Sequence, residues 1–140
     1  MDQFSLRRDD TAEVKLVETN RDYWNKRATK KTVDIVDGLL EILNTELDTP
    51  QQLNYNKYYI GLNDGAKSRN FIYFKPKKQF THIYFEVENQ ENWVEKLDEI
   101  GISATSSKKN LQITVSPKQV SQNTEILTEL IKDSVDYFNK

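Results

Sequence analysis

Apolar residues recur at three- and four-residue steps through the first third of the chain, which places them on one face of an α-helix. The apolar positions are Trp24, Ala28, Thr32, Val36, Leu39, Leu40, Leu43 and Leu47. Asn20 is a suitable N-cap at the start of this pattern. The spacing therefore predicts one long amphipathic helix over residues 21–46. Gly38 lies inside it, and we expect this glycine to mark close packing against a strand.

Four later segments have the composition of β-strands, rich in aromatic and β-branched residues. They comprise residues 57–62, 70–75, 80–87 and 110–115. The turn sequences Asn63-Asp64-Gly65 and Pro76-Lys77-Lys78 separate the first three segments. Because such short connections join antiparallel neighbours, the three segments predict an antiparallel meander.

Two further helices are predicted around the last strand. One begins after Asn89 and stops at Gly101, and the other begins at Ser116-Pro117 and continues to the C-terminus. The element order α-β-β-β-α-β-α predicts an α+β fold, with helices packed on one face of a four-stranded, mainly antiparallel sheet. Residues 20–140 form a single domain in this interpretation. We interpret residues 1–19 as a flexible N-terminal segment or linker, with a short strand at residues 12–18 as the alternative.

The alternation of each predicted strand assigns its side chains to the two faces of the sheet. The inward residues are Ile60, Leu62, Ile72, Phe74, Ile83, Phe85, Val87, Leu111, Ile113 and Val115. The outward residues are Tyr59, Gly61, Phe71, Tyr73, Lys75, His82, Tyr84, Glu86, Gln112 and Thr114. This outer face is unusually aromatic for a solvated surface.

Charge is distributed unevenly along the 140 residues, although the formal net charge is only −2. Residues 55–80 contain six cations and one anion, a local charge of +5, so the remainder carries −7. Cations beside exposed rings suit single-stranded nucleic acid, because cations track phosphates while bases stack on rings. The candidate nucleic-acid-binding residues are Lys57, Lys67, Arg69, Lys75, Lys77, Lys78, Tyr59, Tyr73 and Tyr84.

Two other interpretations of the same residues stay open. Lysines in turns and at strand ends are often simply solvated, and they discourage edge-to-edge aggregation of sheets. The aromatic face can also be covered by the N-terminal segment, by a partner domain, or by a second copy of the chain in a homodimer. The alternative function is therefore protein interaction or homo-oligomerisation through the aromatic sheet face.

The amino-acid composition excludes several classes of chemistry. The chain has no Cys, which excludes disulfides, thiolate metal sites and cysteine nucleophiles, and its only histidine is His82. No apolar run reaches the roughly 18 residues of a membrane span, and no signal peptide is visible, so we expect a cytoplasmic protein without membrane contact. We also expect no catalytic residues, no bound metal and no cofactor.

The carboxylates and the histidine fit structural roles better than catalytic ones. Glu91, Glu95 and Asp98 share one helical face opposite the apolar residues, as on an exposed helix, whereas Mg²⁺ or Ca²⁺ requires several converging oxygens. The N-terminal run Glu13-Val14-Lys15 follows Asp9 and Asp10 too closely for the Asp…Glu-x-Lys arrangement of metal-dependent nucleases. A lone histidine is more often a packing or surface residue than a general base.

The chain resembles a bacterial domain family of unknown function, some members of which carry the label "predicted transport protein". The resemblance covers about residues 20–140. It rests on Tyr23-Trp24 before a helix, on residues 54–62, and above all on the run Phe74-Lys75-Pro76-Lys77-Lys78. The family often lies C-terminal to nuclease-like or restriction-associated domains, which implies an upstream nuclease-like domain as a partner. It implies no catalytic residues.

Taken together, the residues predict a non-enzymatic binding or accessory module that contacts nucleic acid and is associated with a nuclease-type partner.

Overall fold

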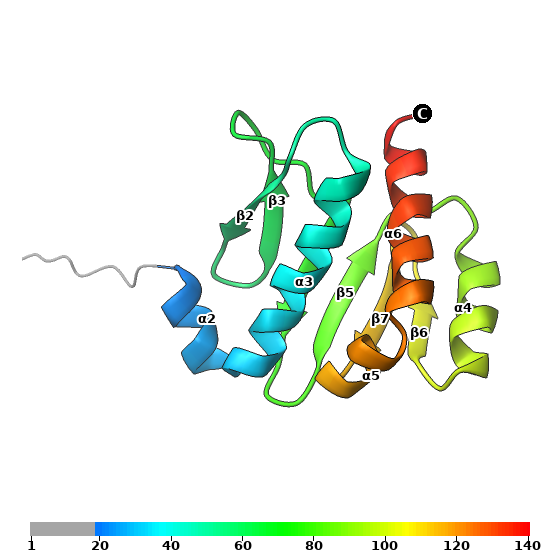
Figure 1. The fold of residues 1–140 in the computed structure, drawn as a ribbon, viewed down its shortest axis with the longest axis horizontal. Coiled ribbons are helices and arrows are strands. Elements are labelled where there is room, and N and C mark those ends of the chain that lie inside the picture. The colour runs from blue at the N-terminus through cyan, green and yellow to red at the C-terminus, as the bar shows by residue number, and fades with distance from the viewer. Residues whose placement is uncertain (1–18) are drawn as a thin grey trace, which may run out of the picture.

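A six-stranded antiparallel sheet forms the centre of the computed structural model, which describes residues 19–140 (Figure 1). Its order across the sheet is β2-β3-β4-β5-β7-β6, and every neighbouring pair is antiparallel. The strands are β2 (Gln52–Tyr55), β3 (Ile60–Asn63), β4 (Ile72–Pro76), β5 (Thr81–Phe85), β6 (Ser103–Ser106) and β7 (Leu111–Val115).

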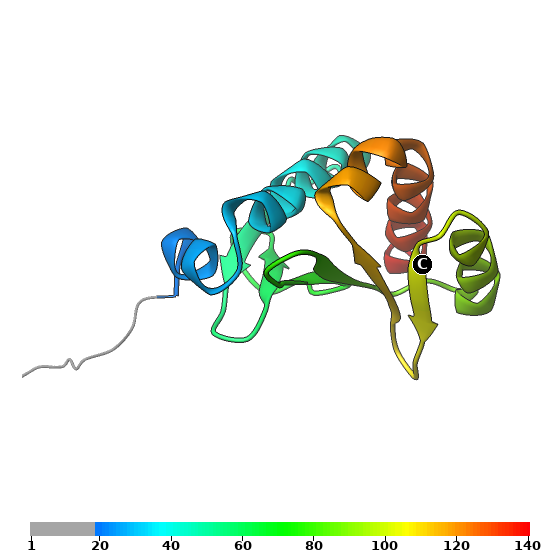
Figure 2. The same cartoon turned by 90° about the horizontal axis from the view of Figure 1, so that it is seen from below.

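Helices pack on one face of this sheet, as Figure 2 shows. They are α2 (Arg21–Arg27), α3 (Lys30–Glu46), α4 (Gln90–Glu99), α5 (Pro117–Gln122) and α6 (Thr124–Phe138). Helices α3 and α6 lie side by side and run in the same direction, while α4 packs beside the edge strand β6 (Figure 1). The predicted α+β class, with helices on one face, is therefore confirmed.

The predicted number of strands was wrong, because the sheet has six strands rather than four. The two additional strands are β2 and β6, each of four residues, and they form the two edges of the sheet. Their side chains are mostly half-buried or exposed. The sequence of β6 has no apolar alternation, and Leu53 and Tyr55 are the only two apolar positions of β2, so pairing with the neighbouring strands, rather than a strong local pattern, forms both edges.

The predicted single helix over residues 21–46 is two helices, separated at Ala28 and Thr29. Asn20 caps α2 as predicted, since its side chain accepts a hydrogen bond from Tyr23 N. Thr29 then starts α3 through a reciprocal capping box with Thr32. The buried side chain of Ala28 continues the apolar periodicity across the break, and periodicity alone therefore could not reveal it.

The helix predicted from Ser116-Pro117 to the C-terminus is also two helices, α5 and α6, with Asn123 between them. Most of the other local predictions are confirmed. Asn89 caps α4, Ser116 caps α5 with Pro117 in its first turn, and Gly101 follows α4 with a positive φ of 81°. Gly65 has a positive φ of 92° in the predicted turn after β3. Gly38, by contrast, has no neighbouring atom within 4 Å of a built Cβ, so the predicted close packing at this position was wrong.

The ten inward side chains predicted from alternation all lie in the core. Phe71 is the exception on the other face: it was predicted to point outward, but it is only 3% exposed and stacks on Phe138 of α6, with 4.1 Å between ring centroids. The residue lies in the turn before β4, where strand alternation does not apply. Its ring therefore belongs to the helix side of the sheet.

Candidate nucleic-acid interface

Three tyrosines form a continuous row on the face of the sheet opposite the helices. Tyr73 of β4 pairs with Tyr84 of β5, and their rings stack with centroids 4.4 Å apart and an interplanar angle of 7°. Tyr59 meets Tyr73 edge-on at 5.5 Å. All three are half-buried. The helices of residues 19–140 pack on the other face of the sheet (Figure 2). We call these three residues the tyrosine row.

Tyr73 and Tyr84 stay uncharged at neutral pH. Partial burial raises the pKa of Tyr73, and the nearby Glu86 and Tyr59 raise it further. Burial and the neighbouring Tyr73 likewise raise the pKa of Tyr84. The two hydroxyls therefore remain hydrogen-bond donors, and the rings keep the electron-rich faces on which bases and cations stack.

Lys75 and His82 lie at one end of the row, as a register pair between β4 and β5. The ammonium group of Lys75 is 5.3 Å from the centroid of the Tyr84 ring. The Nδ1 atom of His82 is 2.8 Å from Thr114 Oγ1 and 3.3 Å from Gln112 Nε2. Burial lowers the pKa of His82, and the two neighbouring cations Lys77 and Lys75 lower it further, so the imidazole is neutral at pH 7.

This environment does not assemble a general base. A catalytic imidazole is usually oriented by a carboxylate. The hydrogen-bond partners of His82 among the described residues are the neutral side chains of Thr114 and Gln112. The imidazole therefore has the contacts of a side chain on the outer face of the sheet.

The predicted cations separate into two groups. Since Ile60 at the start of β3 pairs with Phe74 near the end of β4, the β2–β3 and β4–β5 turns lie at the same end of the sheet. Cations at this end, together with Lys75, are Lys57, Lys77 and Lys78. Lys67 and Arg69 lie at the opposite end, in the loop between β3 and β4. Arg69 Nε also donates to Asp64 Oδ2 at 2.9 Å, so its charge is already paired.

Cations from three other segments join the first group. Arg27 donates to the carbonyl of Lys57 at 2.6 Å, and Lys78 donates to the carbonyl of Lys26 at 3.3 Å. A pocket of about 630 Å³ between the start of α3, the β4–β5 turn and the start of α5 is lined by Lys30, Lys31, Lys78 and Lys118, with no carboxylate. We call this surface the basic end; it comprises Lys26, Arg27, Lys30, Lys31, Lys57, Lys75, Lys77, Lys78 and Lys118.

Five of these residues were not among the predicted site residues: Lys26, Arg27, Lys30, Lys31 and Lys118. The predicted cationic segment covered only residues 55–80, although residues 26–31 contain four cations and no anion. That run of cations could have indicated four of the five residues from the sequence alone. No sequence signal indicated Lys118, because it is isolated in the sequence. Only the pairing of β5 with β7 brings it to this end of the sheet.

Hydrogen bonds fix the β4–β5 turn onto α3. Thr32 Oγ1 donates to the carbonyl of Lys77 at 2.7 Å, and Thr29 Oγ1 donates to the carbonyl of Lys78 at 3.4 Å. The buried Thr81 donates in turn to the carbonyl of Thr32 at 2.7 Å. The turn lysines are therefore held beside the lysines of α3 by their backbones, while their side chains remain in solvent.

The start of α3 adds to the positive potential. The N-terminal end of a helix carries a positive partial charge and favours carboxylates in its first turn. Helix α3 has no acidic residue there, and Lys30 and Lys31 occupy the first two positions. Lys30 is paired with Asp34 at 2.9 Å. Lys31 has no ion-pair partner among residues 19–140, so part of the positive charge is uncompensated.

The other candidate chemistry is not assembled among the described residues. Glu91, Glu95 and Asp98 are exposed on α4, and no group of three His, Asp or Glu side chains in residues 19–140 is placed to hold a metal ion. Asp10 and the run Glu13-Val14-Lys15 lie outside the described residues. No helix in the same part of the chain is long and apolar enough to cross a membrane.

Comparison of the chain with protein-family models, with curated proteins and with solved structures finds no match. The resemblance to the bacterial domain family therefore stays a prediction.

Proposed function

We propose that this protein is a non-enzymatic nucleic-acid-binding module whose ligand is a single strand. The observation that carries the proposal is the continuity of the tyrosine row with the basic end. Lys75 belongs to both surfaces, since it contacts the Tyr84 ring and lies two residues from Lys77 in the turn. A strand crossing the outer face can then stack bases on the rings while its phosphates follow the lysines.

The arrangement favours single strands over duplexes for a physical reason. In a duplex the faces of the bases are already stacked on one another, so the rings have nothing to contact. Stacking on an aromatic side chain is worth about 1 to 3 kcal/mol per base. A pocket of about 260 Å³ between Tyr58, Tyr59, Asn70, Tyr73 and Lys75 gives one base a place beside the row.

Fluorescence anisotropy with labelled single- and double-stranded oligonucleotides of one sequence tests the proposal. We expect tighter binding of the single strand and a steep loss of affinity with salt. The change Tyr73→Ala with Tyr84→Ala should remove the single-strand preference. Lys77→Gln with Lys78→Gln should lower the salt slope by about 1.4, since each single-strand phosphate contact contributes about 0.7.

The matched control is Lys67→Gln with Lys108→Gln. Both residues are exposed lysines outside the basic end, so this change alters net charge equally and should leave the salt slope nearly unchanged. A flat titration up to high micromolar protein at low salt contradicts the proposal.

The second candidate is a protein-interaction or homo-oligomerisation domain. It is favoured by the apolar surface around the tyrosine row, where Tyr58 is 64% and Phe80 37% exposed. Sedimentation velocity separates the two functions. A dimer that persists in high salt and dissociates in the Tyr73→Ala variant favours the interface, whereas a monomer that binds single strands in a salt-sensitive way favours the nucleic-acid function.

The family resemblance supports one further expectation, that the module works beside a nuclease-type partner. In that arrangement it would hold the strand that the partner cuts.

A further inference from the structure

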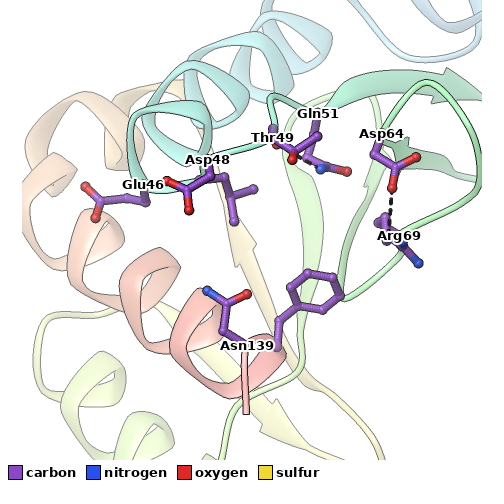
Figure 3. A pocket seen from close by; sticks show the side chains of 9 residues that line it. Glu46, Asp48, Thr49, Gln51, Asp64, Arg69 and Asn139 are labelled. Atoms are coloured by element: carbon purple, nitrogen blue, oxygen red, sulfur yellow. Dashed lines mark hydrogen bonds and ion pairs between the residues drawn. The ribbon is translucent and has the colours of Figure 1, made fainter.

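A third pocket lies at the end of the molecule opposite the basic end. Figure 3 shows it from close by. It has a volume of about 330 Å³ and is lined by the C-terminal ends of α3 and α6, by the segment before β2, and by the loop between β3 and β4. The lining residues are Glu46, Leu47, Asp48, Thr49, Gln51, Asp64, Arg69, Phe138 and Asn139.

The charges around this pocket do not balance. Asp64 is fully engaged, because it accepts hydrogen bonds from the backbone of Ala66 and Lys67 and from Arg69. These bonds hold the pKa of its carboxyl below the ordinary value. Glu46 and Asp48 have no ion-pair partner within residues 19–140, so the pocket keeps two uncompensated negative charges. Figure 3 shows these two side chains on the side of the pocket away from the Asp64–Arg69 pair.

Helix ends strengthen this negative potential. The C-terminal end of an α-helix carries a negative partial charge and favours Lys, Arg or His in the last turn. Neither α3 nor α6 has a basic residue in its last turn, and both end at this pocket. Two helix termini and two carboxylates therefore attract a cation to the same place.

A buried acceptor in the pocket wall lacks a donor. Gln51 is 5% exposed, and its backbone is held by two hydrogen bonds to the side chain of Asn44. Its Nε2 donates to the carbonyl of Thr49 at 3.2 Å, but Oε1 has no partner. Buried side-chain polar atoms are usually paired, so an unpaired one needs an explanation. Figure 3 places this amide between Thr49 and the Asp64–Arg69 pair, where a bound group with N–H donors can satisfy it.

An aromatic ring completes the wall. One face of the Phe138 ring stacks on Phe71, while the residue is 38% exposed and lines the pocket. A planar cation is attracted to the free face of such a ring. A guanidinium combines that planarity with five N–H donors in a fork that fits carboxylates. A metal ion is the poorer match, because no three of the described carboxylates converge to hold one.

We propose that this pocket binds a guanidinium group, supplied either by a small guanidine or by an arginine side chain of a peptide. The proposal is independent of nucleic-acid binding, because it concerns the other end of the molecule.

The test is a titration of the ¹⁵N-labelled full chain with ethylguanidinium chloride, followed by two-dimensional amide NMR. We expect saturable shifts of the Gln51 side-chain amide, of Asn139 and of the Arg69 backbone amide, and none at Lys77 or Lys118. Ethylammonium should bind more weakly, and sodium propionate should not bind. N-acetyl-arginine amide separates the sources, since tighter binding than ethylguanidinium indicates an arginine side chain and weaker binding indicates a small guanidine.

Two exposed residues provide the variants. Asp48→Asn and Glu46→Gln should each weaken ethylguanidinium binding about two- to fivefold, the range expected for one exposed ion pair. Glu91→Gln removes one negative charge from α4 and should change the affinity little. Non-saturating shifts, or equal affinities in all three variants and the parent chain, overturn the proposal.

Discussion

At the scale of single residues, Gly61 shows how a small side chain is required by its neighbour rather than by its own backbone. It lies on the outer face of β3, where the side chain of Asn70 crosses directly over it and accepts a hydrogen bond from Leu62 N at 2.8 Å. A Cβ at this position would overlap Asn70 Oδ1. The glycine therefore allows the loop before β4 to close onto β3.

Two glycine substitutions should have opposite effects on the free energy of unfolding. Gly61→Ala should cost about 1 to 3 kcal/mol, because the added methyl group displaces Asn70 from Leu62. Gly38→Ala should gain up to about 1 kcal/mol, because Gly38 is exposed in the middle of α3 with open space around it. Urea denaturation of both variants measures the difference. If the Gly61→Ala variant is as stable as the parent chain, Asn70 moves aside without a cost in free energy.

His82 should make the stability fall as the pH drops below about 6.5, the ordinary pKa of an imidazole. Its pKa is lowered in the fold by burial and by Lys77 and Lys75, so the unfolded chain takes up the proton at a higher pH than the folded chain does. The stability associated with the neutral imidazole is therefore present above about pH 6.5 and is lost as the pH falls toward the lowered pKa.

Urea denaturation at several pH values, compared with the His82→Gln variant, measures this loss, which the variant should lack. NMR titration of the imidazole should also show a higher pKa in Lys75→Gln and in Lys77→Gln than in the parent chain. An unchanged pKa in both variants would mean that burial alone lowers it.

At the scale of elements, α3 carries charges that oppose its own dipole. Lysines occupy its first turn, and Glu46 ends it with Asp48 two residues further on. Each arrangement is the reverse of the one that stabilises an isolated helix. The apolar face against the sheet, which includes Val33, Val36 and Leu39, compensates through burial. The charges at both ends of α3 therefore lower rather than raise its stability, as expected if they serve the ligands proposed for the two ends.

The change Lys31→Glu should separate stability from binding. A carboxylate in the first turn of α3 should raise the free energy of unfolding by about 0.3 to 1 kcal/mol, while single-strand affinity falls. The control is Lys132→Glu, which makes the same charge change in the middle of α6. It should leave binding nearly unchanged and lower stability slightly, since Glu129 and Asp136 are three and four residues away. Thermal unfolding and anisotropy measured on the same preparations decide the outcome.

At the scale of the whole molecule, the parallel course of α3 and α6 places opposite potentials at opposite ends. Both helices end at the guanidinium pocket, while the basic end gathers the starts of α3 and α5 with the turn lysines. Helix α3 has 17 residues and therefore spans about 25 Å. That length exceeds the Debye length of about 8 Å at physiological ionic strength, so the two ends should act independently.

Independence predicts that saturating single-stranded oligonucleotide changes the affinity for ethylguanidinium by less than about twofold. Equally, the effects of Lys31→Glu and Asp48→Asn on the free energy of unfolding should add, as they do for distant sites without shared partners. NMR titration with and without oligonucleotide, and a double-variant cycle, measure the two quantities. A larger coupling would indicate that α3 transmits a change from one end to the other.

Local signals in the sequence were sufficient for much of this fold. The alternation in β4, β5 and β7 identified the core side chains correctly, because these central strands bury one face completely. The caps at Asn20, Asn89 and Ser116 were equally readable. The break at Thr29 was not, since the buried Ala28 preserves the helical spacing.

The candidate site was only partly predictable. The tyrosine row follows from strand alternation and was correctly placed on the outer face. The grouping of cations was not, because Lys67 and Arg69 are close to Lys75 in sequence yet lie at the other end of β4. The end of the sheet at which a loop lies depends on strand order and register. A count of charges along the chain gives no information about either.

The sequence by itself determined which side chains face the core, where most elements begin, and that cysteine chemistry is absent. Those properties depend on residue type and on the periods of helices and strands, which are local. Only the tertiary structure decided the edge strands, the burial of Phe71, the basic end and the pocket at the C-terminal ends of α3 and α6. Each of these is made by segments far apart in the chain, and their meeting depends on strand pairing and helix packing that no single segment encodes.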